Sequence, residues 1–409
     1  MKQLITILLI AAFMLTAISC SVHQKNNDHS ETSSDGRIQL TLAADIQISQ
    51  LQRIISNFNK NNEKYYIKAV FYVSELNSMD ILRTEIISGK APDIYAFYQD
   101  MSLSGVSVPL YEDLLPYLDA DPSYSRETLI PSLLNVLVKD GTLWCIPFDF
   151  SIMTFIARES VVGRRTGITM KEAQKFAEGM GDDVSVFPRW MDREILLGYM
   201  LGFAIDRYID FENGKCSFDN KDFTVILEQC KNYQGATTKD YSDELLLNYP
   251  LQGFSSVTSI KKIYGGDYCY VGFPTEEGNG NEFELNLRFS ISSQSKHKDG
   301  AWEFVRSVMS EENQREALYL PSTQAELERR INLALEGDPA VIEAKLEPEE
   351  VDKLLELINS TTFLSQYVNS DIYNIVLEEA DAYFAGQNTL DEAVALIQNR
   401  VSLYLAEKS

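Results

Sequence analysis

Histidine is scarce in this chain, with three copies in 409 residues. His23 and His29 lie in a polar stretch near the N-terminus, which leaves His297 alone for the rest of the chain. A zinc site rich in histidine needs several histidines, and a Ser-His-Asp or Cys-His nucleophile system needs one held in a fixed constellation. A single histidine argues against these classes of site, whereas an enzyme that works with carboxylates alone is not excluded.

Positive charge is also in short supply, because 36 basic residues face 60 acidic ones and the formal net charge is −24. This balance argues against nucleic acid as a partner, since phosphate binding needs clustered Lys and Arg. It equally argues against binding an anionic membrane through a basic face. At 45% hydrophobic residues the chain still has enough apolar material for a sizeable core, and its length predicts two or three domains.

Cysteines are sparse and none has the C-x-x-C spacing of a metal or redox motif. Beyond Cys20, the sequence holds Cys145, Cys216, Cys230 and Cys269, which we expect to be buried, inert thiols rather than a disulfide framework. Cys145 and Cys269 both lie in apolar, strand-like runs, so a pairing of these two is an open alternative. No D-x-D-x-D-G loop is present for calcium, and we expect neither metal nor cofactor.

The longest uncharged apolar run, residues 4–19, is too short to span a bilayer comfortably. It follows Lys2, ends in small residues and has the form of an export signal. The sequence Ala17-Ile18-Ser19-Cys20 resembles the bacterial lipoprotein box, with Ala17 where leucine is usual, and so predicts cleavage after residue 19 and lipid on Cys20. Residues 20–36 then form a lipidated cysteine and flexible tether. The alternative is an ordinary signal followed by an incidental cysteine.

Alternating strand and helix patterns begin at residue 37. Residues 37–43, 65–72 and 93–97 are rich in strand formers, and residues 48–58 and 76–88 have helical apolar spacing between them. This order predicts an α/β fold with a parallel sheet covered by helices. Ligands of such sheets bind beyond the carboxyl ends of the strands, which here include Asp45 and residues 97–100.

Several later segments have patterns that predict particular elements of secondary structure. Residues 110–118 predict a surface helix, Asp140-Gly141 a turn, and residues 390–406 a final helix. Residues 142–157 are extended but broken by Pro147, which favours two strands in two different sheets joined at a crossing.

A set of short motifs resembles the extracellular solute-binding proteins of family 1, the sugar-type binding subunits of ATP-driven importers. The motifs run in the family's order over nearly the whole mature chain: Phe58-Asn59-Lys60, Gly89 to Ile94, Asp140 to Pro147, Gly272-Phe273-Pro274, Glu277 to Gly280, Ala301 to Phe304 and Ile397 to Arg400.

The resemblance implies a two-lobe periplasmic-binding-protein fold of type II, with each lobe a sheet flanked by helices. The chain would cross between lobes near residues 146–150, return near 268–273 as a first-lobe strand, and cross again near 320. Lobe 1 would hold 37–147 and about 268–320, and lobe 2 would hold 148–267 and about 321–409.

The resemblance also implies a function. The chain would capture a carbohydrate, expected to be an oligosaccharide, between the lobes and present it to the permease of an ABC importer. It would act as a monomer, without catalysis, held at the outer face of the membrane by lipid on Cys20. Two alternatives are a binding protein for a polyamine, suggested by the acidity, and an exported glycoside hydrolase with two carboxylates.

Sugars present hydroxyls and flat C–H faces, so their sites need carboxylates or amides together with aromatic rings. The positions that match the family's cleft predict a binding set from both lobes. Its members are Asp45, Phe97, Asp100, Asp149, Phe150, Trp190 and, with weaker support, Tyr270 and Tyr373. Structural roles compete with binding for some of them, because Phe97 can fill the core and Asp45 and Asp100 can cap helices. Trp302 and Gly278-Asn279-Gly280 are assigned to the core and to a turn.

Overall fold

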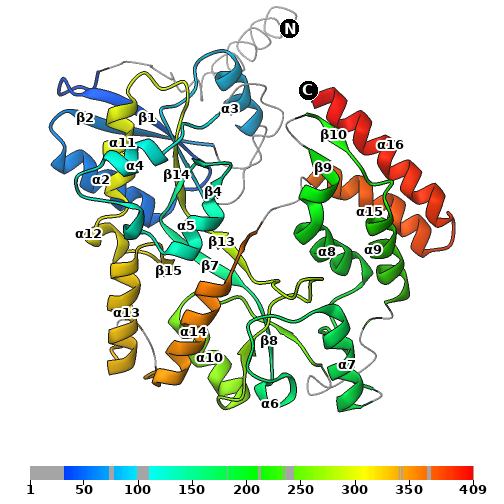
Figure 1. The fold of residues 1–409 in the computed structure, drawn as a ribbon. Coiled ribbons are helices and arrows are strands. Elements are labelled where there is room, and N and C mark those ends of the chain that lie inside the picture. Colours follow the sequence, from blue (N-terminus) through cyan, green and yellow to red (C-terminus); the bar gives the residue numbers. More distant parts are fainter. Residues whose placement is uncertain are drawn as a thin grey trace, which may run out of the picture.

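The computed structural model describes residues 32–72, 78–98, 110–181, 183–210, 213–233, 235, 244–339, 341, 344–365 and 370–408. Figure 1 shows a sheet with its covering helices at the upper left, a group of helices at the right, and strands between these two parts. The predicted signal peptide and Cys20 lie outside the described residues, as does Asp100.

The first sheet has five strands in the order β2 (Tyr65–Phe71), β1 (Ile38–Ala44), β3 (Ile94–Phe97), β14 (Arg288–Ile291) and β6 (Ile146–Pro147). Strand β1 runs parallel to β2 and β3, while β14 runs antiparallel to β3 and β6. Helix α2 (Ser49–Asn61) buries Leu51, Ile54 and Phe58, and α3 (Ser78–Ile87) packs against the other face of the sheet. The predicted alternation of strands and helices in this region is confirmed.

Helix α11 (Lys298–Ser307) also covers the first sheet, and Trp302 is 7% exposed there, as predicted for a core residue. Between β3 and β6 lie α4 (Leu115–Ala120), the 3-10 turn η1 (Arg126–Thr128), α5 (Pro131–Leu137) and the hairpin β4 (Val138–Lys139) and β5 (Thr142–Leu143). The prediction of a surface helix over 110–118 is wrong, because the helix begins at Leu115 and its leucines pack into the core.

The extended stretch 142–157 contributes strands to four sheets. Strand β5 pairs with β4, β6 belongs to the five-stranded sheet, β7 (Asp149–Met153) joins a four-stranded sheet, and β8 (Phe155–Ala157) joins a three-stranded one. The predicted change of sheet beside Pro147 is therefore confirmed, and the stretch divides further than expected. The turn predicted at Asp140-Gly141 closes the β4–β5 hairpin, with both residues at positive φ.

The four-stranded sheet has the order β15 (Leu320–Pro321), β7, β13 (Glu282–Leu285) and β16 (Phe363–Leu364). The prediction that residues 268–273 return to the first lobe as a strand is wrong. Instead, β12 (Cys269–Tyr270) pairs antiparallel with β8, and β11 (Leu247–Asn248) pairs with the other edge of β8. The chain returns to the first sheet later, between β13 and β14, at Asn286 and Leu287.

Three crossings of the chain meet at one point, and two buried side chains hold them together. The Asp149 carboxylate accepts hydrogen bonds from the backbone N–H groups of Leu287 (3.2 Å), Leu318 (3.1 Å) and Tyr319 (3.2 Å). The Gln314 amide donates to the Phe148 carbonyl (3.0 Å) and accepts from the Ser322 N–H (3.0 Å). Asp149 and Gln314, which we call the crossing clasp, are 3% and 0% exposed.

A second hydrophobic core gathers helices from distant parts of the sequence, on the right of Figure 1. Its helices, with the short strands beside them, are α7 (Met170–Met180), α8 (Arg193–Tyr208), β9 (Ile209–Asp210), β10 (Lys215–Cys216), α9 (Lys221–Asn232), α15 (Ser370–Phe384) and α16 (Leu390–Lys408). The predicted final helix is confirmed, and it buries Ala393, Ile397, Val401 and Leu405 while Leu396 is exposed.

The remaining helices are α6 (Glu159–Val162), α10 (Phe254–Tyr264), α12 (Glu311–Gln314), α13 (Gln324–Glu336) and α14 (Pro348–Ser360). Helices α10 and α14 contribute to the same core cluster as the first sheet. At the start of α14, Glu350 is 5% exposed and pairs with Lys261 (2.9 Å). The predicted limits of the two lobes stay predictions.

The four cysteines in the described part of the chain are free thiols. Cys145 lies in the first core and Cys269 in the second, so the structure does not pair them. Burial raises the pKa of Cys145 to about 12 and that of Cys269 to about 11, as expected of inert thiols. Within the described residues, no helix combines the length and the apolar character needed to cross a membrane.

Candidate solute-binding site

One face of the four-stranded sheet is polar, although the opposite face is packed with rings. Strand β13 alternates, so that Phe283 and Leu285 enter the core while Glu282 and Glu284 point the other way. Phe150 and Phe283 contact each other on the core side, with ring centroids 5.3 Å apart. The period-2 pattern of the strand therefore places its two carboxylates on a single face.

The neighbouring strand β7 supplies the other groups of this face. Ser151 lies opposite Glu284 and Met153 lies opposite Glu282 in the antiparallel register. The Asn286 side-chain amide donates to the Ser151 hydroxyl (2.9 Å), which shows that the polar groups of the two strands share a face. We call this side of the sheet the polar sheet face. It consists of the partly exposed Met153, Glu282 and Glu284 and the buried Asp149, Ser151 and Asn286.

Tyrosines from the first core border one side of the polar sheet face. The Tyr98 and Tyr319 hydroxyls lie 2.6 Å apart, joining the end of β3 to the third crossing. The Asp45 carboxylate accepts from the Tyr98 N–H (2.9 Å) and so fixes the backbone where β3 ends. Burial raises the pKa of Tyr98, and so do its hydrogen bond to Tyr319 and the charges of Asp149 and Glu284, which places this ring beside the carboxylates.

Rings from the second core border the other side. Burial and the nearby Glu282 charge raise the pKa of Tyr199, a residue of α8 whose ring stacks on Phe273 (5.1 Å). The Asn248 amide donates to the Tyr199 hydroxyl (3.1 Å). Phe363, the backbone partner of Glu282 in β16, contacts Phe203 of α8 (5.3 Å). Side chains of both hydrophobic cores therefore meet around the same pair of glutamates.

Two acidic groups of the polar sheet face, Glu282 and Asp149, have elevated pKa values. Burial, with a smaller contribution from Glu284, raises the pKa of Glu282 to about 7. Burial raises the pKa of Asp149 to about 6, although three backbone N–H groups and Arg330 oppose that rise. Carboxylates in this state accept or donate hydrogen bonds readily, which suits them to polar organic molecules.

The sequence matches a family model over residues 53–323, described as bacterial extracellular solute-binding protein. This match covers more than half of the chain. The chain belongs to the bacterial extracellular solute-binding proteins. The expected family resemblance is thereby confirmed, and no curated protein matches this solute-binding protein by sequence.

Solved structures of similar fold include the sugar-binding protein MalE of Xanthomonas citri, with a TM-score of 0.61 and 15% identity over 90% of this chain and 98% of that one. A Listeria monocytogenes ABC substrate-binding protein in complex with cycloalternan has a TM-score of 0.53 and 15% identity, over 90% of this chain and 99% of that one. A cyclic alpha-maltosyl-1,6-maltose binding protein of Arthrobacter globiformis has a TM-score of 0.54 and 13% identity, over 91% of this chain and 100% of that one. These likenesses confirm the predicted two-lobe α/β fold of the solute-binding protein.

The solute-binding protein brings some of the predicted site residues together and separates others. Asp45 and Asp149 both lie at the polar sheet face or next to it, linked through Tyr98. Phe97 is 3% exposed and lies in the hydrophobic cluster on the α3 side of the first sheet. Phe150 is 0% exposed and lies on the apolar face of the four-stranded sheet. Asp100 is outside the described residues.

Trp190, Tyr373 and Tyr270, the other residues of the predicted set, have three different surroundings. Trp190 is 45% exposed and precedes the helix cap Asp192 of α8. The Tyr373 hydroxyl donates to the Glu194 carbonyl (3.1 Å) in the first turn of the same helix. Tyr270 is 1% exposed and packs edge-on against Tyr268 (5.6 Å) inside the core. Their roles in binding stay predictions.

The sequence reasoning missed the glutamates that define the polar sheet face. The run Asn281-Glu282-Phe283-Glu284-Leu285-Asn286 alternates polar and apolar residues and could have been recognised as a strand with one wet face. Tyr98, Tyr199 and Tyr319 carry no comparable local signal, because contacts between distant elements bring them to this face.

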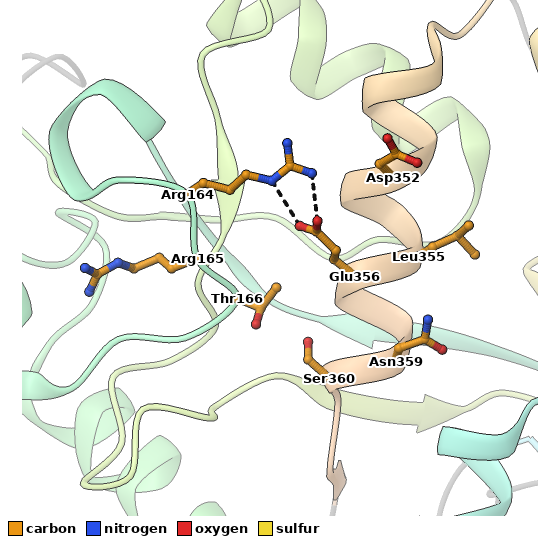
Figure 2. A pocket seen from close by; sticks show the side chains of 8 residues that line it. All are labelled: Arg164, Arg165, Thr166, Asp352, Leu355, Glu356, Asn359 and Ser360. Atoms are coloured by element: carbon orange, nitrogen blue, oxygen red, sulfur yellow. Dashed lines mark hydrogen bonds and ion pairs between the residues drawn. The ribbon is translucent and has the colours of Figure 1, made fainter.

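A separate polar hollow of 760 Å³ lies between residues 164–166 and α14 (Figure 2). The Arg164 guanidinium in this hollow already has a partner, because it donates two hydrogen bonds to the Glu356 carboxylate, at 2.7 and 3.2 Å. Arg165 points away from α14 and pairs with Glu172 (3.2 Å). This hollow joins no residues of the polar sheet face, and no cluster of metal-ligating side chains occurs within the described residues.

Proposed function

We propose that this solute-binding protein captures a carbohydrate on the polar sheet face and delivers it to the permease of an ABC importer. The observation that carries the proposal is the pair of partly exposed glutamates on β13, with the buried Ser151 hydroxyl and Asn286 amide on the same face and tyrosines from both cores at its borders. Sugars need such hydrogen-bonding groups together with flat apolar surfaces. The sugar ligands named for the solved neighbours support the same class of solute.

The mechanism follows from the two sides that meet at this face. A solute that touches Tyr98 or Tyr319 on one side and Tyr199 on the other gains contacts only when the two parts are close together. Its binding energy therefore favours the closed arrangement, by the difference in its affinity for the two states. The permease would recognise that arrangement and distinguish loaded from empty protein.

The ligand class is tested by thermal shift with a panel of sugars, polyamines and peptides. Saturable stabilisation by a carbohydrate is expected, since a ligand that binds only the folded state raises its stability. Stabilisation by a polyamine and by no sugar would reverse the assignment. The same sugars incubated with the protein should remain intact, and turnover at a useful rate would favour the two-carboxylate hydrolase instead.

Trp190 supplies a test of the second-lobe contact. We expect Trp190→Ala to weaken binding of the carbohydrate found in the panel by about 3- to 10-fold, because a ring that stacks on the sugar is lost. Leu403→Ala is the matched control, since Leu403 is another large apolar side chain on the surface, 64% exposed, in α16. Unchanged affinity in the Trp190 variant, measured by calorimetric titration, would show that this ring does not contact the solute.

The lipid anchor is tested separately from the ligand. We expect Cys20→Ser to move the protein from the membrane fraction to the soluble exported fraction, because the acylated thiol holds it at the membrane. Cys216→Ser removes another thiol that is not fully buried, and this control should remain with the membrane. Equal partition of wild type and the Cys20 variant would mean that the segment acts as an ordinary signal peptide. Fractionation followed by immunoblotting measures both.

A further inference from the structure

The Glu282 carboxylate lacks a counter-charge. It is enclosed enough for burial to raise its pKa to about 7, yet part of the residue remains accessible. No hydrogen bond or ion pair joins it to another described residue, and the one charged group acting on it is Glu284, which has the same sign. An enclosed carboxylate without a counter-charge is costly, and part of this residue is accessible, which points to a ligand that supplies the charge.

Three basic residues of the fold are already engaged by other groups. Arg330 acts on Asp149, pairs with Glu326 (2.9 Å) and donates to the Tyr319 carbonyl (3.0 Å). Arg288 lies over the Trp144 ring at 5.5 Å. Lys353 pairs with Glu159 (2.7 Å) on another side of the fold. The missing positive charge beside Glu282 is therefore not provided by any of these side chains.

The rings around the two glutamates suit a cation as well as a sugar face. Tyr199 is near enough to Glu282, and Tyr98 to Glu284, for the carboxylate charges to act on the phenol groups. An ammonium group attracts both carboxylates and aromatic faces, and it has three hydrogen-bond donors and no acceptor. A neutral hydroxyl can donate to Glu282 but leaves the charge uncompensated.

We propose that the carbohydrate taken by this protein is an amino sugar, whose protonated amine lies against Glu282 between the Tyr199 and Tyr98 rings. This inference rests on the proposed carbohydrate function and narrows it to one chemical class. The ammonium supplies the charge that Glu282 lacks, while a hydroxyl of the same ring bonds to Glu284, which like Glu282 is partly exposed. Binding a neutral sugar would keep the enclosed carboxylate unpaired.

Calorimetric titration compares short glucosamine oligomers with their N-acetylated forms and with glucose oligomers of the same length and linkage, with spermidine as a further probe. These three sugars differ only in the group at one ring position, so the comparison isolates the amine. We expect the free-amine oligomer to bind at least about 10-fold more tightly than either neutral oligomer, as for other charge pairs that lose water on binding.

Glu282→Gln should remove this preference. It is expected to weaken binding of the amine oligomer by about 10-fold and to change binding of the neutral oligomers by less than about 3-fold. Because the wild-type carboxylate is enclosed and unpaired, the variant should fold with an equal or higher melting temperature. Glu277→Gln is the matched control: it removes the same charge from an exposed turn residue close by in the chain and should leave every affinity unchanged.

The outcomes separate the inference from the proposed function. Equal or tighter binding of a neutral oligomer, or an amine preference that survives Glu282→Gln, overturns the amino-sugar inference and leaves the carbohydrate function standing. Binding of spermidine without any sugar overturns the carbohydrate function itself, and with it the inference. Absence of binding by every sugar in the set counts against both.

Discussion

Asp149→Leu is expected to lower the free energy of unfolding by about 3–5 kcal/mol, because it leaves buried donors without an acceptor. The carboxylate accepts from Leu287, Leu318 and Tyr319, which belong to the other two crossings of the chain. An apolar side chain of similar size fills the space but satisfies none of these three N–H groups. The loss should appear in urea unfolding as a lower midpoint.

The control for this prediction is Asp352→Leu. Asp352 is exposed on α14, so the same exchange there should change stability by less than about 0.5 kcal/mol. A similar small change in the Asp149 variant would mean that the crossings hold together without the carboxylate, and the crossing clasp would lose its assigned role.

The pH dependence of stability should change in the same variant. Burial raises the pKa of Asp149 to about 6 in the folded protein, above the ordinary value near 4. Between about pH 4 and 6 the folded state therefore holds a proton that the unfolded state has released, and stability falls as the pH rises through this window. Asp149→Leu should flatten that fall, while Glu282 maintains a slope of the same sign up to about pH 7.

Gly167→Ala is expected to cost about 3 kcal/mol, a large effect for one methyl group. A Cβ atom at Gly167 would overlap the Gly278 carbonyl, a backbone group that cannot swing away. The turn predicted at Gly278-Asn279-Gly280 is confirmed by the hydrogen bond from the Asn279 N–H to Thr275 (3.0 Å). Asn281 also donates to the Thr166 carbonyl (2.7 Å), so the two loops are joined where the methyl would enter.

Gly179→Ala makes the same exchange where nothing lies within 4 Å of the added Cβ, inside helix α7. There the methyl should raise stability by about 0.5–1 kcal/mol, because glycine is a poor helix former. Opposite signs in the two variants, measured by urea unfolding, are the expected result. A Gly167 variant as stable as wild type would show that the 163–169 loop can move away from residues 272–281.

The parts of the fold that the sequence predicted are those with local patterns. Residues 37–97 alternate strands and helices with clear apolar periods, and Pro147 marked the change of sheet. The prediction for residues 268–273 failed because a short apolar run pairs equally well with several partners. Only the free edge of β8, created by distant residues 155–157, decides that β12 lies there.

The candidate site also divides into residues with a local sequence signal and residues that only distant contacts bring together. Asp149 could be singled out because a carboxylate in an apolar strand requires a partner, and it has three. The sequence suggests Phe97 and Phe150 as binding rings, but the alternation of side chains along their strands points both rings into hydrophobic cores. Tyr98, Tyr199 and Tyr319 converge only through the tertiary fold, which no local pattern reveals.

The order of the first sheet has a consequence for how the chain matures. Strand β14 lies between β3 and β6 in the sheet, and in the sequence it follows helices α7, α8 and α9 of the second core. Until residues 288–291 have been synthesised, β3 has β1 on one edge but no neighbour on the other, and β6 has no strand of this sheet to pair with. Pairings between such distant residues form slowly. A growing chain that ends before residue 288 would therefore remain incompletely folded. An export channel that accepts only unfolded chains could still transport it in that state.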